Sequence, residues 1–337
     1  MKRALITGIE GQDGYYLSKL LKEKDYQVFG ICRKKATHDI NGSNTSEYYE
    51  KIYADMCDFT SLYTCINEVM PDEIYNLAGL SEIPLSWKQP VLTADVNGLG
   101  VLRLLEAVRL SVPNARFIQS STSEIFDFID EPLTENSSFA PRNPYGSAKL
   151  FAHWITTNYR ESYNMYACSA ILFNHESPRR GIEFVTRKIS IAVAKIFFGL
   201  QDVLELGNLD AVRDWGSADD YVFAMWLMLQ QDIPSDYIVA TGKGHTVRDF
   251  VTCAFKAVDI DIEWKGHGFD EIAINVKTGK TVVRVNPKFY RYPSKDIIVG
   301  NPEKINKELG FFPQKSFEDM VNEIVSNDLN LLLRGLK

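Results

Sequence analysis

A tyrosine and a lysine stand four residues apart in the stretch NPYGSAKL, residues 143–150. If this stretch is helical, Tyr145 and Lys149 project from the same face. A phenol with a pKa of about 10 is a poor base at neutral pH, but a nearby ammonium stabilises its phenolate. The chain contains 16 tyrosines, so a buried structural tyrosine fits the spacing too. Beside a redox cofactor, the pair would instead be the base that oxidises an alcohol.

The first expected strand, residues 3–7, ends in the sequence TGIEGQDGYYL. Its glycines, Gly8, Gly11 and Gly14, permit a tight turn and let the backbone approach a pyrophosphate, which the start of the next helix then favours. An ordinary glycine turn is the alternative. Because the motif follows a strand and opens a helix, it predicts a dinucleotide site.

The end of the second expected strand, residues 26–32, indicates which dinucleotide binds. An acidic residue usually stands here in NAD sites, where it bonds the ribose 2′-hydroxyl. This chain has Arg33 and Lys34 instead, which would pair with a 2′-phosphate. A solvated basic turn is the alternative, but the pattern favours NADP. Asp55, after the third strand, is expected beside the adenine.

A threonine and a glutamate follow the strand 116–122 in the sequence QSSTSEIF. Ligands of parallel α/β sheets bind at the carboxyl ends of the strands, so both side chains should reach the nicotinamide. Thr122 could hold a substrate hydroxyl. Glu124 has no task in a simple dehydrogenase, but it could move a proton from one sugar carbon to a leaving hydroxyl. The alternative is a glutamate that caps a helix or faces water.

Apolar strands alternate with amphipathic helices through the first half of the chain, which predicts an α/β fold with a doubly wound, Rossmann-type parallel sheet. Residues 1–173 are expected to form the NADP-binding domain, which the chain re-enters at about 210–245. Residues 174–337 are expected to form a smaller, mixed lobe for the substrate, with a hairpin around 277–280. One long helix is expected near 93–110.

Composition excludes several classes of function. The net charge of −7 gives no electrostatic case for a nucleic-acid partner. No apolar run is long enough to span a membrane, and no secretory leader is visible. Five scattered cysteines without a C-x-x-C pair indicate reduced thiols, a cytoplasmic location and no structural zinc site.

Several longer segments narrow the interpretation. The glycine motif, Thr-Ser-Glu and Tyr-x-x-x-Lys resemble the extended short-chain dehydrogenase/reductases that act on nucleotide sugars. The segments YNLAGLS, FIQSSTSE, ILFNHESPRRG and LGNLDAVRDWG are similar to the GDP-mannose 4,6-dehydratase family. The likeness runs from residue 1 to about 329.

The resemblance implies a hydro-lyase reaction. Tyr145 would take the C4 hydroxyl proton while C4 passes hydride to NADP. Glu124 would remove the C5 hydrogen and assist loss of the C6 hydroxyl as water, before hydride returns to C6. The product would be a GDP-4-keto-6-deoxy sugar. The family's tetramers also imply that this chain is a homo-oligomer, either a dimer or a tetramer.

The resemblance also implies the site residues. The catalytic set would be Thr122, Glu124, Tyr145 and Lys149. The cofactor set would be Gly8, Gly11, Gln12, Asp13, Gly14, Arg33, Asp55, Met56, Leu77, Ala78, Tyr145, Lys149, His175 and Arg180. The substrate set would be Ser81, Glu82, Ser86, Asn174, Lys188, Asn208, Arg213 and Arg291.

The chain departs from the family beside the expected sugar. Glu82, Ile83 and Pro84 stand where the family has histidine, valine and a small residue, and Leu85 and Trp87 follow. Phe126 and Asp127 replace a Tyr-Gly pair. GDP-mannose is the expected substrate, with a GDP-manno-heptose as the alternative. The same motifs have two other interpretations. The protein could be a GDP-sugar 4-oxidase or 4-epimerase, or a catalytically silent NADP-binding regulator.

Overall fold

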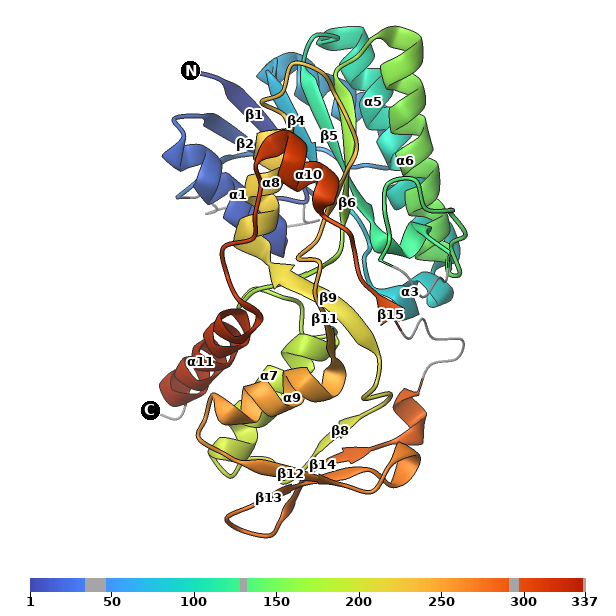
Figure 1. Cartoon of the computed structure of the whole chain (residues 1–337). Coiled ribbons are helices and arrows are strands. Elements are labelled where there is room, and N and C mark those ends of the chain that lie inside the picture. Colours follow the sequence, from blue (N-terminus) through green and yellow to red (C-terminus); the bar gives the residue numbers. More distant parts are fainter. Residues whose placement is uncertain (34–46, 128–131, 291–296, 336–337) are drawn as a thin grey trace.

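The computed structural model has two lobes with a narrower region between them (Figure 1). It describes residues 1–33, 47–127, 132–290 and 297–335. The first lobe contains the N-terminus, and the second carries the C-terminal helix at its side (Figure 1).

A seven-stranded sheet forms the first lobe, in the order β10-β6-β5-β4-β1-β2-β3. Every neighbouring pair is parallel. The strands are β1 (Arg3–Thr7), β2 (Gln27–Cys32), β3 (Glu50–Tyr53), β4 (Glu73–Asn76), β5 (Arg116–Thr122), β6 (Ala167–Leu172) and β10 (Tyr237–Val239). The sequence thus predicted the fold class and most of the strand limits correctly.

Helices cover both faces of this sheet, which is the predicted doubly wound arrangement (Figure 1). One face packs on α1 (Gln12–Glu23), α8 (Ala218–Met228) and α10 (Glu303–Leu309), and the other on α2 (Phe59–Val69), α5 (Gly100–Ser111) and α6 (Pro144–Tyr163). Adjacent residues of β1 serve different faces: Ile6 belongs to the first core and Leu5 to the second. Each such buried side chain contributes roughly 1.5–3 kcal/mol.

The second lobe is mixed. One small sheet has the order β12-β13-β14-β8, and another has the order β11-β9-β15 with β7 beside β9. The strands are β7 (Asn174–Glu176), β8 (Leu204–Leu206), β9 (Val212–Ser217), β11 (Gly244–Thr246), β12 (Ile262–Lys265), β13 (Ile272–Asn275), β14 (Thr281–Val285) and β15 (Ile297–Ile298). The helices α7 (Val185–Phe197), α9 (Val247–Lys256) and α11 (Phe317–Gly335) pack against each other.

The hairpin that we expected around 277–280 is present. β13 and β14 run antiparallel, and Asn275 N–H donates to the Lys280 carbonyl at 2.9 Å. Gly279 has φ +70°, which L residues with side chains rarely adopt.

The long helix expected at 93–110 is interrupted. The chain forms the short helices α3 (Ile83–Lys88) and α4 (Pro90–Ala94), a π-helical turn (Asp95–Leu99) and then α5. The turn contains Asn97, whose buried side chain accepts from Leu80 N–H at 2.8 Å and donates to the Leu80 carbonyl at 3.0 Å. The extra residue in the π turn therefore points the Asn97 side-chain amide at the loop after β4. Such turns are common beside functional sites.

The apolar segment at residues 166–174 is divided between two strands. β6 ends at Leu172, and β7 leaves the large sheet to pair with β9, placing Asn174 opposite Trp215. The chain passes from one lobe into the other at this point.

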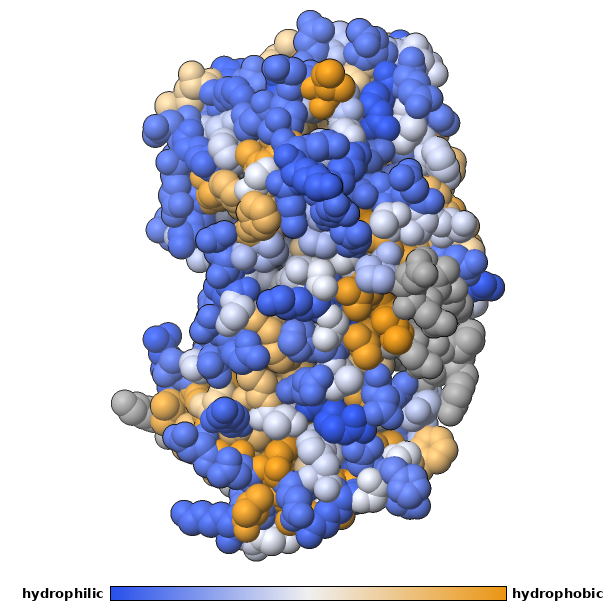
Figure 2. Space-filling model, in the orientation of Figure 1, coloured by the Kyte–Doolittle hydropathy of each residue, from blue (hydrophilic) through white to orange (hydrophobic). Residues whose placement is uncertain are grey.

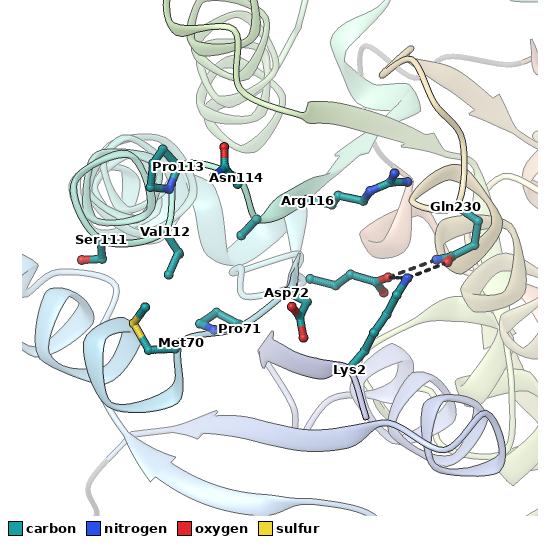
Figure 3. A pocket seen from close by; sticks show the side chains of 12 residues that line it. Lys2, Met70, Pro71, Asp72, Ser111, Val112, Pro113, Asn114, Arg116 and Gln230 are labelled. Carbon is teal, nitrogen blue, oxygen red and sulfur yellow. Dashed lines mark hydrogen bonds and ion pairs between the residues drawn. The ribbon is translucent and has the colours of Figure 1, made fainter.

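A shallow pocket of about 580 Å³ lies at the amino ends of β1, β4 and β5 (Figure 3). It is lined in part by the Glu73 carboxylate, whose side chain is 1% exposed. Four donors surround that carboxylate: Lys2 Nζ at 2.8 Å, Tyr26 OH at 3.0 Å, Tyr75 OH at 2.8 Å and Gln230 Nε2 at 3.3 Å. The Glu73 carboxylate and its four donors thus satisfy one another, so we assign this cluster a structural role.

The surface face in Figure 2 is mostly hydrophilic, with separate hydrophobic groups on the second lobe and near the junction of the lobes. Among the residues that the structure describes, no helix has the length and apolar character needed to cross a bilayer. The same part of the chain holds no group of His, Cys, Asp and Glu side chains that could bind a metal. All five cysteines are free thiols.

Candidate active site

A cavity of about 1180 Å³ lies between the lobes, at the carboxyl ends of the parallel strands. Its lining contains all of the residues that we predicted for the site except Lys34, Ser86 and Arg291. The predicted residues found in the lining are Gly8, Gly11, Gln12, Asp13, Gly14, Arg33, Asp55, Met56, Leu77, Ala78, Ser81, Glu82, Thr122, Glu124, Tyr145, Lys149, Asn174, His175, Arg180, Lys188, Asn208 and Arg213. The fold thus brings together groups as far apart in the sequence as Gly8 and Arg213.

The glycine turn between β1 and α1 forms one wall. Gly8 has φ +66°, and a Cβ there would lie 2.8 Å from the Leu77 carbonyl. A Cβ on Gly14 would lie 2.5 Å from the backbone of Ile9, so only glycine allows α1 to start this close to the strand. No side chain caps the N-terminus of α1, and its positive end faces the cavity. This cradle fits the pyrophosphate of a dinucleotide.

Two residues at the cavity edge match the adenosine end of such a cofactor. Arg33 follows β2 directly and is exposed at the rim. Asp55 follows β3, and its carboxylate accepts from Cys57 N–H at 2.8 Å, which fixes the loop. Lys34, the second basic residue of the predicted pair, lies outside the described residues.

Tyr145 and Lys149 lie in the first two turns of α6. Asn143 caps this helix by accepting from Gly146 N–H at 2.7 Å, and Pro144 occupies its first position. Both Tyr145 and Lys149 are buried and line the cavity, as their spacing predicted. The Lys149 ammonium lies 5.9 Å from the centre of the Tyr145 ring and donates to the Ser120 carbonyl at 2.8 Å.

Burial shifts both groups away from their charged forms. It raises the pKa of Tyr145 to about 12, although the hydrogen bond with Thr122 works in the opposite direction. Burial likewise lowers the pKa of Lys149 to about 8. Formation of a phenolate here therefore requires further positive charge, and an oxidised nicotinamide would bring it.

Glu124 lies between Thr122 and the start of α6. It belongs to a short 3-10 turn (Ser123–Ile125), and its backbone N–H donates to Thr122 Oγ1 at 3.3 Å. Its carboxylate accepts from Asn143 Nδ2 at 3.0 Å. The side chain is partly exposed in the cavity, so it can reach a ligand; it is neither a helix cap nor directed at bulk water.

A hydrogen-bonded pair of a histidine and a carboxylate joins the glycine turn to β7. His175 Nε2 lies 2.9 Å from Asp13 Oδ2, and Gln12 Nε2 donates to the His175 carbonyl at 3.0 Å. Ser177 Oγ donates back to Gln12 Oε1 at 2.8 Å. The turn expected to hold the cofactor is thus bonded to the first strand of the second lobe.

The second lobe supplies polar and basic groups to the opposite end of the cavity. Lys188 on α7 lies over the ring of Phe289 at 3.7 Å, and Arg213 on β9 and Asn208 after β8 lie on the same wall. Arg180 pairs with Glu176 at 3.2 Å and lines the cavity. Cations and an exposed aromatic ring suit a nucleoside diphosphate.

Two predicted substrate residues are not placed in the cavity. Ser86 is fully buried in α3, where its hydroxyl donates to the Ile83 carbonyl at 2.7 Å, so it supports the loop and does not line the site. Arg291 lies outside the described residues. Glu82 precedes α3 and lines the cavity, as do Ile83 and Pro84.

Asn97 and Asn143 hold parts of the cavity wall by hydrogen bonds, and neither residue was identified from the sequence. An asparagine followed by proline is a typical sequence signal for the start of a helix, so the capping role of Asn143 could have been predicted. Its second hydrogen bond, to Glu124, could not. No sequence pattern indicated Asn97. Its bond to Leu80 forms because a π-helical turn places its side chain next to the loop after β4.

The comparisons with known proteins agree over nearly the whole chain. Residues 5–324 match the family model described as GDP-mannose 4,6 dehydratase. A GDP-mannose 4,6-dehydratase of Yersinia enterocolitica is 47% identical over 98% of this chain and 94% of its own length. The human GDP-mannose 4,6 dehydratase is 46% identical over 98% of this chain and 92% of its own.

Solved structures of lower identity share the fold. A dTDP-glucose 4,6-dehydratase from Bacillus anthracis in complex with NAD has a TM-score of 0.80 at 20% identity, with all of both chains covered. RMD from Pseudomonas aeruginosa, complexed with NADPH, has a TM-score of 0.79 at 20% identity, covering 98% of this chain and 100% of its own. The family resemblance inferred from the motifs is therefore confirmed, and this chain belongs to the GDP-mannose 4,6-dehydratase family.

Proposed function

We propose that this protein is an NADP-dependent dehydratase that converts GDP-mannose to GDP-4-keto-6-deoxymannose. The observation that carries the proposal is the position of Glu124, in the same cavity wall as Thr122 and Tyr145. A dehydrogenase, an oxidase or a 4-epimerase needs only the tyrosine and the lysine, whereas elimination of water needs a further acid-base group. The names of the relatives also favour GDP-mannose over a GDP-heptose.

In the oxidation step, Tyr145 removes the proton of the C4 hydroxyl. Thr122, within hydrogen-bond reach of the phenol, orients that hydroxyl, and Lys149 contributes its positive charge from the next turn of the helix. NADP, when bound, accepts hydride from C4, adds positive charge near Tyr145 and returns hydride to C6 at the end of the cycle. The cofactor is regenerated, so the net reaction is loss of water.

Glu124 acts between the two hydride transfers. Once C4 is a ketone, the hydrogen on C5 is acidic, and the Glu124 carboxylate removes it. The resulting carboxylic acid then donates this proton to the C6 hydroxyl, which leaves as water. When hydride returns to C6, C5 takes up a proton and Tyr145 gives up the proton that it took from the C4 hydroxyl, so the protons balance over the cycle. Asn143 Nδ2 holds one carboxylate oxygen at 3.0 Å, which leaves the other free to carry the proton.

Each part of the chain has its place in this proposal. Residues 1–173, together with α8 and β10, bind the cofactor, and the remaining residues bind the nucleotide sugar. Lys188, Asn208 and Arg213 hold the GDP moiety, and Glu82 faces the hexose. The reaction belongs to the cytoplasm, where five free thiols stay reduced.

The test is mass spectrometry of the products from a panel of GDP-sugars. GDP-mannose is expected to lose one water with no accumulation of NADPH absorbance. Stoichiometric release of NADPH, or conversion of a GDP-heptose in preference to GDP-mannose, would contradict the proposal.

The preference for NADP rests on Arg33, whose guanidinium would bond the 2′-phosphate. Arg33→Asp should weaken NADP binding by tenfold or more and improve NAD binding, since the carboxylate accepts from a ribose hydroxyl. Lys19→Asp, an exposed change of the same charge on α1, is the control. Equal NADP dissociation constants for the two variants would remove Arg33 from the cofactor site.

The protein is also proposed to be a homo-oligomer. Exposed apolar side chains gather on α4, the π turn and α6, which pack together: Val91, Leu92, Leu99, Phe151 and Trp154. A patch of this kind suits an interface between two copies. Trp154→Lys should shift the molar mass measured by light scattering toward that of the monomer, and an unchanged mass would exclude this face.

A further inference from the structure

Both ring nitrogens of His175 face hydrogen-bond acceptors. Nδ1 lies 2.8 Å from the Phe173 carbonyl oxygen, and Nε2 lies 3.0 Å and 2.9 Å from the two carboxylate oxygens of Asp13. A neutral imidazole carries one N–H and would leave one nitrogen lone pair facing an acceptor. Only the imidazolium, with two N–H donors, satisfies both contacts.

The other groups around His175 are consistent with a cation. The ring of Tyr221, on α8, stacks on the imidazole with 4.8 Å between centroids and an angle of 27° between planes. An aromatic face favours a cation that lies over it. Burial lowers the pKa of His175, and Arg180 also lowers it, but the Asp13 carboxylate outweighs both and the pKa is raised. Glu176, the next acid along β7, is occupied by Thr186 Oγ1 at 2.6 Å and by Arg180.

The partner carboxylate lies where its charge would matter to catalysis. Asp13 stands in the first turn of α1 on the cavity wall. Burial is the largest cause that raises the pKa of Tyr145, and the charges of Glu124 and Asp13 raise it further. Arg180 balances part of the Asp13 charge, and Asp13 in turn raises the pKa of Lys149. Without the charge of His175, Asp13 would oppose the phenolate more strongly and would also repel an anionic cofactor at the glycine turn.

We propose that His175 is a positioning residue that remains an imidazolium throughout turnover and neutralises Asp13, so that this carboxylate can hold the glycine turn against β7 without opposing ionisation of Tyr145. The role in catalysis rests on the proposed function, in which Tyr145 is the base. The charge state of His175 does not rest on it.

The first measurement is the ring ¹⁵N spectrum of His175 in the wild-type protein, titrated from about pH 6 to about pH 9, well past the ordinary histidine pKa. Both ring nitrogens should still give the shifts of a protonated imidazolium above the ordinary histidine pKa. His153, buried in α6 outside the cavity with a lowered pKa, is the internal control and should be neutral. A neutral His175 near pH 7 would overturn the proposal.

The second measurement is the pH profile of kcat/KM for His175→Gln, which keeps a side-chain donor but removes the charge. The limb that reports ionisation of the base should move to higher pH by about one unit, which is roughly a tenfold loss of kcat/KM below that limb. The double variant Asp13→Asn/His175→Gln replaces the ion pair by two amides and should return the limb to the wild-type position. His153→Gln should leave the profile unchanged.

The outcomes separate the two parts of the argument. A uniform loss of kcat/KM at every pH, not recovered in the double variant, would mean that His175 only supports the fold. If His175→Gln does not fold, the single variant Asp13→Asn takes its place: without the carboxylate, burial and Arg180 should leave the His175 ring neutral in the ¹⁵N spectrum. An imidazolium that persists in this variant overturns the proposal. If Tyr145→Phe keeps its activity while the spectrum shows an imidazolium, the proposed function fails and the charge assignment stands.

Discussion

At the scale of single residues, Glu124 is the side chain whose removal should separate the steps of the reaction. Glu124→Gln keeps an oxygen that can accept from Asn143, but the amide cannot take the C5 proton. We expect kcat to fall by about 100-fold or more, while oxidation at C4 persists. With GDP-mannose in heavy water, the variant should show NADPH absorbance with little deuterium at C5.

Tyr145→Phe is the matched control, because it should prevent the first hydride transfer and thus give neither signal. Near-normal dehydration by Glu124→Gln would mean that another group removes the C5 proton.

The burial of the Lys149 ammonium should lower the free energy of unfolding of the protein. Its folded-state pKa of about 8 lies below the ordinary 10.5, so the unfolded chain holds this proton more tightly. Stability should therefore be lowest where Lys149 is charged in both states and should rise as pH increases from about 8 to about 10.5. Lys149→Met should raise the free energy of unfolding near pH 7 by on the order of 1–3 kcal/mol and abolish activity.

Urea unfolding of both proteins across this pH range is the measurement. The difference between them should shrink with rising pH. A less stable methionine variant at pH 7 would show that the bond from Lys149 to the Ser120 carbonyl outweighs the cost of burying the charge.

At the scale of elements, the start of α6 does two things with one side chain. Asn143 Oδ1 caps the helix and Nδ2 holds Glu124. Asn143→Asp keeps the cap but places a second carboxylate beside Glu124, so we expect a similar melting temperature with kcat reduced about tenfold or more and a raised pKa of Glu124. Asn143→Ser, which also caps, removes the bond without adding charge and should have the smaller effect on kcat.

The check is kcat against pH, combined with thermal melting. The limb for the general base should move to higher pH in Asn143→Asp only. An equal loss in both variants would mean that the hydrogen bond, and not the charge of the carboxylate, determines how Glu124 acts.

Elements whose pattern is local could be predicted from the sequence. The limits of β1 and β5 match because their apolar runs are bounded by turn residues, and α6 begins at a visible Asn-Pro cap. The division between β6 and β7 could not be predicted, because it depends on pairing with β9, forty residues later. The π turn at Asp95–Leu99 has the same origin, since only the distant loop around Leu80 explains why Asn97 is displaced from the helix.

The site residues divide in the same way. Gly8, Glu124 and Tyr145 belong to motifs whose spacing predicts where their side chains or backbone lie, and all three line the cavity. Ser86 was assigned by likeness alone, and its hydroxyl is used within α3. The bond between Asp13 and His175 spans 162 positions, so no local pattern could indicate it.

At the scale of the whole molecule, Glu73 cross-links the amino ends of the strands, on the side of the sheet opposite the cavity. Figure 3 shows Lys2 and Gln230, from opposite ends of the first lobe's sequence, pointing toward each other in this cluster. Glu73→Ala would leave Tyr26 and Tyr75 hydroxyls without their acceptor. We expect the free energy of unfolding to fall by about 2–4 kcal/mol with kcat/KM unchanged, since the cavity lies at the other ends of the strands.

Urea denaturation gives the stability, and Lys2→Ala is the control. Its ammonium is half exposed, so its removal should cost about 1 kcal/mol or less. Equal losses in the two variants would assign the effect to the ion pair and not to the tyrosine hydroxyls.

The order in which the strands of the large sheet are synthesised affects folding during translation. β6 accepts its outer neighbour, β10, only about 65 residues later in the chain, after much of the second lobe has been synthesised. At about 5–20 residues per second, a ribosome needs roughly 3–13 s to cover that distance. During this interval the edge of β6 is unpaired, and unpaired edges are sites of aggregation. Slow translation through residues 173–236 should therefore lower the yield of native protein, whereas a pause after Val239 should not.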